Sequence, residues 1–215
     1  MLLKTRFSNM VNNMNDYSFH ILGCGAIGSS TATQLVRTGA ENFYLYDMDT
    51  VSIENVGVSE YFQDDIGHKK VDALKNHIKA VNNEANIEAI NGRFERLEES
   101  FNSIVVLGFD SMLSRLEAME SICKNKAKPL LIIDGRMGAE QFQQYMFKNP
   151  TLSEYKKNWY SDESGDPEPC TAKATSYCSN MSGSFIVNSI RKFITDQPYD
   201  KKLLFHFPSM FLEIS

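Results

Sequence analysis

The fold is decided by the stretch Ser18-Phe19-His20-Ile21-Leu22-Gly23-Cys24-Gly25-Ala26-Ile27-Gly28. Residues 18–22 form a short β-prone apolar run, and residues 27–36 have the apolar spacing of a helix. The intervening glycines fit the pattern Gly-x-Gly-x-x-Gly. Between a strand and a helix, such glycines let the backbone approach a phosphate, whose charge the helix N-terminus stabilises. The sequence therefore predicts that Gly23, Gly25, Ala26, Ile27 and Gly28 bind a nucleotide.

Outward from this stretch, strand-like and helix-like segments alternate, which is typical of an α/β fold with a mostly parallel sheet and helices on both faces. We expect a Rossmann-like fold with antiparallel strands toward the C-terminus. Further strands are predicted at residues 43–46, 87–90, 103–107, 129–133, 141–147, 203–207 and 210–214. Further helices are predicted at residues 65–81, 113–127 and 174–194. A polar, proline-containing loop is predicted at residues 148–169.

The bulk composition limits the class of protein. The 215 residues, of which 42% are apolar, predict one domain over residues 1–215. A net charge of −5 without a Lys/Arg cluster argues against nucleic acid as a partner. No apolar run approaches the roughly 20 residues that span a bilayer, and the Asn-rich N-terminus has no signal-peptide centre. We therefore expect no membrane association and a cytoplasmic location.

A carboxylate follows the second predicted strand. Asp47 and Asp49 lie about 20 residues beyond the glycine pattern, where an acidic side chain can accept hydrogen bonds from ribose hydroxyls. Taken alone, this arrangement fits an NAD-dependent oxidoreductase as well as an ATP-binding protein. No second catalytic domain follows, and no Tyr-x-x-x-Lys motif accompanies the glycines, which disfavours the oxidoreductase.

Three motifs in order distinguish these alternatives. The first is Asp47-Met48-Asp49-Thr50-Val51, which leads to Asn55; the second is Asp65-Ile66-Gly67-His68-Lys69-Lys70. The third, Asp110-Ser111-Met112-Leu113-Ser114-Arg115, follows a predicted strand. In this order and spacing the motifs resemble those of the ThiF/MoeB/HesA family, the ubiquitin-activating-enzyme-like adenylyltransferases. The resemblance extends over about residues 18–145 and more loosely through the last helix.

The resemblance implies a role for each motif. It implies that the glycine turn faces the phosphates of ATP, that Asp49 holds the ribose and that Asn55 lies near the phosphates. It also implies that Lys70 contacts the phosphates and that Asp110 helps hold Mg²⁺. The implied reaction is adenylylation of the C-terminal carboxylate of a small ubiquitin-like or sulfur-carrier protein. The resemblance further implies a homodimer.

Several residues depart from the family pattern. Val58 stands where a phosphate-stabilising arginine is expected, and Arg6 is the single arginine kept from an N-terminal family segment. These departures favour an alternative, a nucleotide-binding pseudoenzyme subunit without the catalytic arginines. The family's zinc needs two Cys-x-x-Cys pairs, which are missing here, so we expect no zinc. Cys170 precedes a predicted helix, which makes it the better candidate for a covalent nucleophile, whereas Cys178 shares its helix's apolar face and is expected to be buried.

Simpler interpretations of the same residues remain open. Asp110 could only cap the following helix, because aspartate is a favoured N-cap residue. Lys70 could be only a solvated side chain. Asp134, at the predicted end of a strand, could be a turn former or a site residue. Trp159 could fasten the 148–169 loop or recognise a partner.

Overall fold

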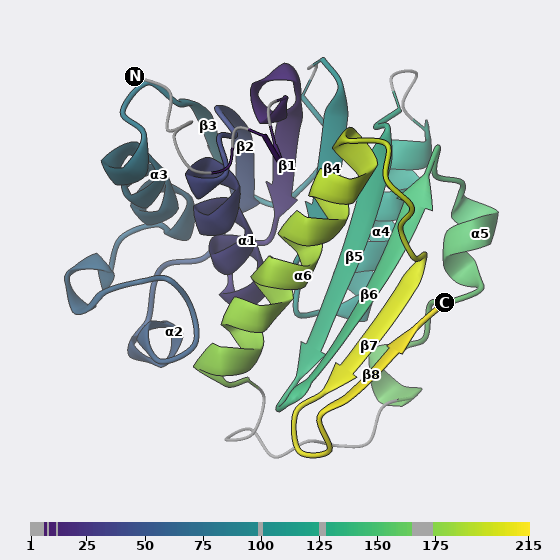
Figure 1. The fold of residues 1–215 in the computed structure, drawn as a ribbon. Helices are drawn as coiled ribbons and strands as arrows, with labels where there is room; N and C mark the ends of the chain where they lie inside the picture. The colour runs from purple at the N-terminus through teal and green to yellow at the C-terminus, as the bar shows by residue number, and fades with distance from the viewer. Residues whose placement is uncertain (1–6, 8, 12, 99–100, 125–127, 165–173) are drawn as a thin grey trace.

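An eight-stranded sheet runs through the protein in the order β3-β2-β1-β4-β5-β6-β7-β8 (Figure 1). The structure is a computed structural model that describes residues 7, 9–11, 13–98, 101–124, 128–164 and 174–215. Helices cover both faces of the sheet. The prediction of an α/β, Rossmann-like fold is confirmed.

The N-terminal half of the sheet is parallel. Its strands are β1 (Ser18–Leu22), β2 (Asn42–Asp47), β3 (Asn86–Asn91), β4 (Ser103–Leu107) and the first part of β5 (Leu131–Gly138). β1 pairs in parallel with both β2 and β4. Central strands of a parallel sheet are covered on both faces, which explains why β1 is buried at all five positions. The strand order reverses between β1 and β4, the place where such sheets bind ligands.

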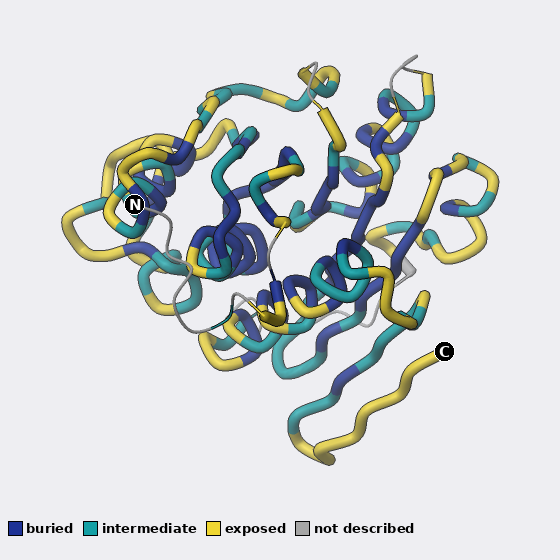
Figure 2. Tube along the Cα trace, turned by 45° about the horizontal axis from the view of Figure 1, so that its top comes forward, coloured by how far each residue is buried: buried dark blue, intermediate teal, exposed yellow. Residues whose placement is uncertain are grey.

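The C-terminal half is antiparallel, as predicted, and consists of β6 (Gln141–Lys148), β7 (Lys202–His206) and β8 (Phe211–Ile214). The expected end of β5 at residue 133 is wrong, because the strand continues to Gly138 by pairing with β6 across a hairpin. Apolar periodicity missed this extension, which carries the charged residues Asp134 and Arg136. β8 is an exposed edge strand (Figure 2).

Two hydrophobic clusters lie on opposite faces of the sheet. The first is formed with α1 (Ala26–Arg37), α3 (Lys70–Val81) and α6 (Ser176–Ile194). The second is formed with α4 (Met112–Lys124) and α5 (Leu152–Lys156). In Figure 1, α1, α3 and α6 lie in front of the sheet and α4 lies behind it. The helices thus cover the two faces of the sheet, so the candidate site lies at the ends of the strands.

Some predicted boundaries move. The helix expected from residue 65 begins at Lys70, because Asp65 ends a separate 3-10 helix, η2 (Gln63–Asp65), and accepts a hydrogen bond from the Phe62 N–H at 2.7 Å. The crossover between β2 and α3 also contains the short helix α2 (Ile53–Val56). The predicted 148–169 loop contains α5 and a 3-10 helix, η3 (Asp162–Ser164). Another 3-10 helix, η1 (Met14–Asp16), precedes β1.

Within the described residues, no helix has both the length and the apolar character needed to cross a membrane.

Candidate nucleotide-binding site

The glycine turn after β1 is built by close backbone contacts. Gly23 has φ +91°, and a Cβ there would lie 2.8 Å from the carbonyl carbon of Gly108. A Cβ on Gly28 would lie only 1.9 Å from the Gly23 oxygen. The Gly23 N–H donates to Tyr46 O at 2.8 Å, and the Gly108 N–H donates to Leu22 O at 2.7 Å. The turn therefore requires glycine at these positions and is fixed against the ends of β2 and β4.

The start of α1 forms an open cradle. Its N-cap residue is Gly25, which has no side chain to accept a hydrogen bond from the first N–H groups of the helix. A Cβ built on Gly25 meets nothing within 4 Å. The first N–H groups of a helix have no partner within the helix, and the helix dipole adds positive potential at that end. The geometry and donors at Gly25 and Ala26 thus fit a phosphate group.

Asp47 shapes the turn from the end of β2. Its Oδ2 accepts a hydrogen bond from the Cys24 N–H at 2.7 Å, and its Oδ1 accepts one from the Asp49 N–H at 2.8 Å. Both carboxylate oxygens therefore have backbone partners, and the side chain ties the glycine turn to the segment that carries Asp49. This arrangement gives Asp47 a structural role next to the site.

Asp49 and Lys70 form an ion pair, with Nζ 2.8 Å from Oδ2. The Lys70 side chain is 11% exposed and that of Asp49 is 56% exposed. The backbone joins them as well, because the Lys70 N–H donates to Asp49 O at 3.0 Å. The interpretation of Lys70 as a merely solvated side chain is therefore wrong. The structure therefore brings together Asp49, predicted to bind the ribose, and Lys70, predicted to bind the phosphates.

The crossover segment is anchored beneath the same site. The Tyr61 hydroxyl donates to Cys24 O at 2.6 Å and contacts Lys70 O at 3.2 Å. Burial raises the pKa of Tyr61 above its usual range, which keeps this hydroxyl protonated as a donor. Asn55 lies in α2, where its Oδ1 accepts a hydrogen bond from the Ser52 N–H at 2.9 Å. Its side chain therefore helps to fold the segment that also presents Val58.

Asp110 lies exposed just beyond the end of β4. The N-terminus of α4 is capped by other side chains. Asp162 accepts from the Met112 N–H at 2.7 Å and from the Leu113 N–H at 3.3 Å, and Ser111 Oγ accepts from the Ser114 N–H at 3.2 Å. The capping interpretation of Asp110 is therefore not supported, because Asp162 and Ser111 perform that role.

A buried charge cluster lies beneath Asp110, and sequence reasoning did not find it. The fully buried Asp134 carboxylate accepts hydrogen bonds from Arg115 Nη1, from Arg136 Nε at 2.9 Å and Nη2 at 2.7 Å, and from the Tyr155 hydroxyl at 3.1 Å. Burial acts to lower the pKa of Arg136, but the Asp134 carboxylate outweighs it and the pKa is raised. Asp134 is thus neither a turn former nor an exposed ligand. The signal was present, because residues two apart on a strand share one face.

The segment after β6 packs against the start of α4. Trp159 Nε1 donates to Met112 O at 2.8 Å, and Arg136 Nη1 donates to Asn158 O at 2.7 Å. The Arg136 guanidinium also lies 4.4 Å from the centre of the Tyr145 ring. Of the two interpretations of Trp159, its contact with Met112 supports the one in which it fastens the loop.

Two of the cysteines for which the structure describes the surroundings, Cys24 and Cys178, are buried. Cys178 is buried, as predicted, and burial together with Glu140 raises its pKa to about 11. Burial likewise raises the pKa of the Cys24 thiol well above its usual value. Cys170, the candidate nucleophile, and Arg6, the arginine kept from the N-terminal family segment, lie outside the described residues.

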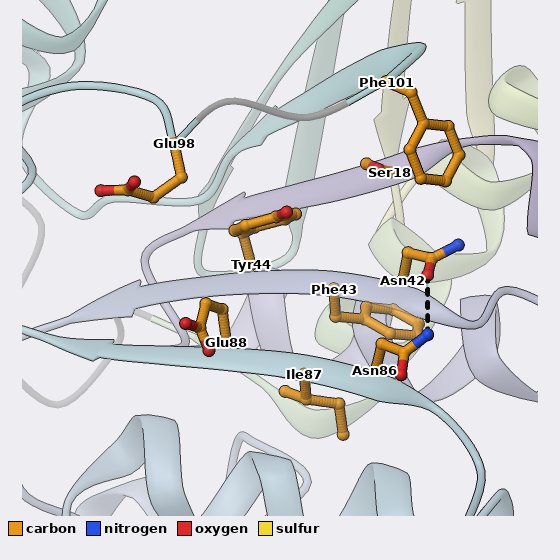
Figure 3. Close-up of a pocket in the computed structure, with 9 residues that line it drawn as sticks. All are labelled: Ser18, Asn42, Phe43, Tyr44, Asn86, Ile87, Glu88, Glu98 and Phe101. Atoms are coloured by element: carbon orange, nitrogen blue, oxygen red, sulfur yellow. Dashed lines mark hydrogen bonds between the residues drawn. The ribbon is translucent and has the colours of Figure 1, made fainter.

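A separate cavity lies at the opposite ends of the strands. It has a volume of about 370 Å³ and is lined by the first residues of β1, β2 and β3, Ser18, Asn42 and Asn86 (Figure 3). Among the lining residues, Asn86 Nδ2 donates a hydrogen bond to Asn42 Oδ1 at 3.1 Å. The glycine turn follows the other end of β1, so this cavity is not part of the candidate nucleotide site.

The fold and the site together define a Rossmann-like protein with a glycine turn at the β1/β4 switch point. The chain belongs to the ThiF family, whose model matches residues 4–213. The resemblance seen in the sequence motifs is thereby confirmed.

Curated relatives agree with this membership. The chain is 29% identical over 155 residues to ubiquitin-like modifier-activating enzyme 5 of Oryza sativa subsp. japonica, which covers 72% of the chain and 33% of that protein. It is 26% identical over 155 residues to the enzyme of the same name from Arabidopsis thaliana, with the same coverage. The chain thus spans about a third of the length of these relatives.

Solved structures support the fold. PaaA has a TM-score of 0.74 and 20% identity, with coverage of 94% of this chain and 64% of that one. MccB of E. coli with ATP has a TM-score of 0.69 and 14% identity, with coverage of 96% and 65%. MccB with MccA-N7isoASN has a TM-score of 0.73 and 13% identity, with coverage of 96% and 66%. The chain therefore spans about two thirds of these structures and shares their fold.

Proposed function

We propose that the chain binds ATP·Mg²⁺ and adenylylates the C-terminal carboxylate of a small ubiquitin-like or sulfur-carrier protein. The observation that carries this proposal is the open cradle at Gly25, which lies on a turn tied to the Asp49–Lys70 pair in a member of the ThiF family. Two solved neighbours, MccB with ATP and MccB with MccA-N7isoASN, add support. We further propose that residues 1–215 form a single nucleotide-binding domain.

The site residues divide the work of binding. The N–H groups at Gly25 and Ala26 hold phosphate oxygens, and Asp49 accepts hydrogen bonds from the ribose hydroxyls. Asp49 turns from Lys70 toward the ribose, which leaves the Lys70 ammonium in place to act on the phosphates as a point charge. Asn55 lies beside the phosphates, and Asp47 keeps the turn in shape.

The proposed reaction brings anions together. A carboxylate oxygen of the carrier protein attacks the α-phosphorus of ATP, the bond from that phosphorus to the bridging oxygen breaks, and pyrophosphate leaves. The products are an acyl-adenylate and pyrophosphate. Because the reacting groups are all negative, catalysis consists mainly of positioning and charge neutralisation by Lys70 and by backbone N–H groups.

Asp110 is the residue that we propose as a ligand of Mg²⁺. Its exposed carboxylate fits the oxygen chemistry of the ion, and Mg²⁺ is usually held by one or two carboxylates together with substrate phosphates. The described residues contain no group of three or more His, Cys, Asp or Glu that could hold a metal alone, so the nucleotide would supply the remaining ligands with water. When bound, the ion would neutralise charge on the phosphates.

One observation favours an alternative, a nucleotide-binding pseudoenzyme. Val58 is half-buried where the family pattern has an arginine, and Arg115 and Arg136 are both bound to the buried Asp134, which prevents either from replacing that arginine. A catalytic arginine would then have to be another arginine of the chain, such as Arg93 or Arg6, or come from a second copy of the chain. We also propose a homodimer, as the family resemblance implies; a monomeric mass at micromolar concentration would contradict it and would exclude Arg6 acting on a partner's site.

Exchange of labelled pyrophosphate into ATP, with and without candidate carrier proteins, tests the proposed function. Carrier-dependent exchange is expected for an adenylyltransferase. ATP binding without exchange for any carrier would support the pseudoenzyme. Tighter binding of NAD than of ATP would overturn both and favour an oxidoreductase.

A further inference from the structure

The loop that presents Asp110 is held from below by one guanidinium. Arg115 Nη1 donates to Leu107 O at 3.1 Å, and Arg115 Nη2 donates to Phe109 O. These two carbonyls lie on either side of Gly108. The single buried side chain of Arg115 therefore fixes the backbone up to the residue before Asp110.

The same loop contacts the glycine turn. A Cβ on Gly108 would lie 3.1 Å from Gly23 O and 3.3 Å from the Gly28 nitrogen, so no gap separates the two loops. The position of Phe109 O therefore sets where Asp110 stands relative to the turn that we propose to hold the phosphates. A displacement of well under a bond length matters at such a site, because electrostatic catalysis depends on fixed geometry.

Arg115 is itself held in place by Asp134. Arg115 is 3% exposed and Asp134 is fully buried. A buried ion pair cannot open without leaving an uncompensated charge in the interior, so this pair keeps its geometry. Arg136, on the other side of the same carboxylate, is directed to Asn158 O and to none of the β4–α4 carbonyls that Arg115 binds.

We propose that Arg115 is a positioning residue that sets the Mg²⁺-binding geometry of Asp110 through the carbonyls of Leu107 and Phe109, with Asp134 as its buried support. This proposal rests on the proposed function, because it assigns Asp110 to the metal. It adds a residue that acts on the site without touching nucleotide or carrier.

The test compares Arg115→Lys with Arg136→Lys. Both substitutions weaken a buried contact with Asp134, but only the first removes the fork that holds the β4–α4 loop. Amide hydrogen exchange of residues 108–111 is measured without nucleotide, and binding of a non-hydrolysable ATP analogue is measured against Mg²⁺ concentration. Thermal unfolding of each variant reports its stability.

Arg115→Lys is expected to speed amide hydrogen exchange in residues 108–111. It should also raise the Mg²⁺ concentration for half-maximal binding of the ATP analogue by about tenfold, a difference of about 1.4 kcal/mol. Arg136→Lys is expected to change the Mg²⁺ requirement by less than about twofold, even if both variants unfold at the same lower temperature. Equal Mg²⁺ shifts in the two variants, or unchanged loop exchange in Arg115→Lys, would overturn the proposal.

Two further measurements keep the result decidable. If Arg115→Lys does not fold, Asp134→Asn keeps the shape of the support without its charge and is expected to shift the Mg²⁺ requirement in the same direction. If the wild-type chain binds the analogue with no dependence on Mg²⁺, the metal assignment in the proposed function fails. Amide hydrogen exchange of residues 108–111 still decides whether Arg115 holds the loop.

Discussion

Lys70 Nζ lies 2.8 Å from Asp49 Oδ2, so the two side chains that we propose to bind opposite ends of a nucleoside phosphate bind each other. Lys70 is nearly buried and Asp49 is half-exposed, which leaves the carboxylate free to turn toward a ribose while the ammonium stays in place. The pair keeps the lysine charge compensated until a phosphate replaces the carboxylate.

Asp49→Ala is expected to weaken ATP·Mg²⁺ binding by removing the ribose hydrogen bonds, each worth about 0.5–1.5 kcal/mol. The fold should survive, because Asp49 lies on the surface. Calorimetry with ATP and with NAD measures the effect, and Asp64→Ala, another exposed carboxylate of the crossover segment, is the control. Equal affinities of Asp49→Ala and the wild type would exclude Asp49 from the site.

Two glycine substitutions separate folding from binding. Gly28→Ala places a methyl 1.9 Å from Gly23 O and is expected to destabilise the fold by about 1–3 kcal/mol or more. Gly25→Ala enters open space, so the change in unfolding free energy should stay within about 0.5 kcal/mol. The same methyl fills the cradle and should reduce ATP affinity at least about tenfold. If Gly25→Ala binds ATP normally, the phosphates lie elsewhere.

Asp110→Asn is expected to leave the fold intact, because the helix cap is supplied by Asp162 and Ser111. Removing the metal's anionic ligand should lower magnesium-dependent pyrophosphate exchange by about 100-fold or more, by analogy with loss of one transition-state contact. Titration with Mg²⁺ at fixed ATP checks this expectation. An unchanged rate with an unchanged Mg²⁺ dependence would exclude Asp110 as a ligand.

His20 makes the stability of the protein depend on pH. Burial lowers its pKa to about 3, whereas an unfolded chain has a histidine pKa of about 6.5. Between these values the unfolded state binds the extra proton. The free energy of unfolding therefore falls as the pH decreases from about 6.5, by at most about 1.4 kcal/mol per pH unit.

His20→Phe should remove that slope while keeping a ring stacked on Tyr44, whose centre lies 4.5 Å from that of His20. Urea unfolding between about pH 7 and 5, above the range in which most carboxylates titrate, measures the difference. The absolute stability of the variant does not affect the comparison, because the slopes are compared. Parallel pH profiles would show that folding does not lower the pKa of His20.

The cysteines give the last prediction. If a thioester follows adenylylation, a thiolate attacks the acyl carbon of the acyl-adenylate and AMP leaves. Cys178 is unsuited to this step because it is buried with a pKa of about 11, so Cys178→Ala should keep any thiol-labile carrier adduct. Cys170→Ala should abolish that adduct and retain pyrophosphate exchange. An adduct that persists in Cys170→Ala would reject Cys170 as the nucleophile.

The sequence determined the features that follow from local patterns. The apolar runs of β1 and β4 and the apolar spacings of α1 and α3 depend on side-chain period, and the turn at Gly23 depends on a backbone with φ +91°. These signals lie within a few residues of one another. They are sufficient to predict the parallel sheet, the glycine turn and the family.

The tertiary structure decided the pairs that join distant segments. Asp162 caps α4 from 50 residues away, and Asp134 collects Arg115 and Arg136 in the interior. No local pattern specifies such contacts, because they depend on how the segment after β6 packs on α4 and on how far β5 continues in its hairpin. Burial then makes the Asp134 ion pairs persistent, since an unpaired charge in the interior costs several kcal/mol. Because this cost arises only in the packed chain, the tertiary structure keeps Arg115 on Asp134 and, through Arg115, fixes the loop that carries Asp110.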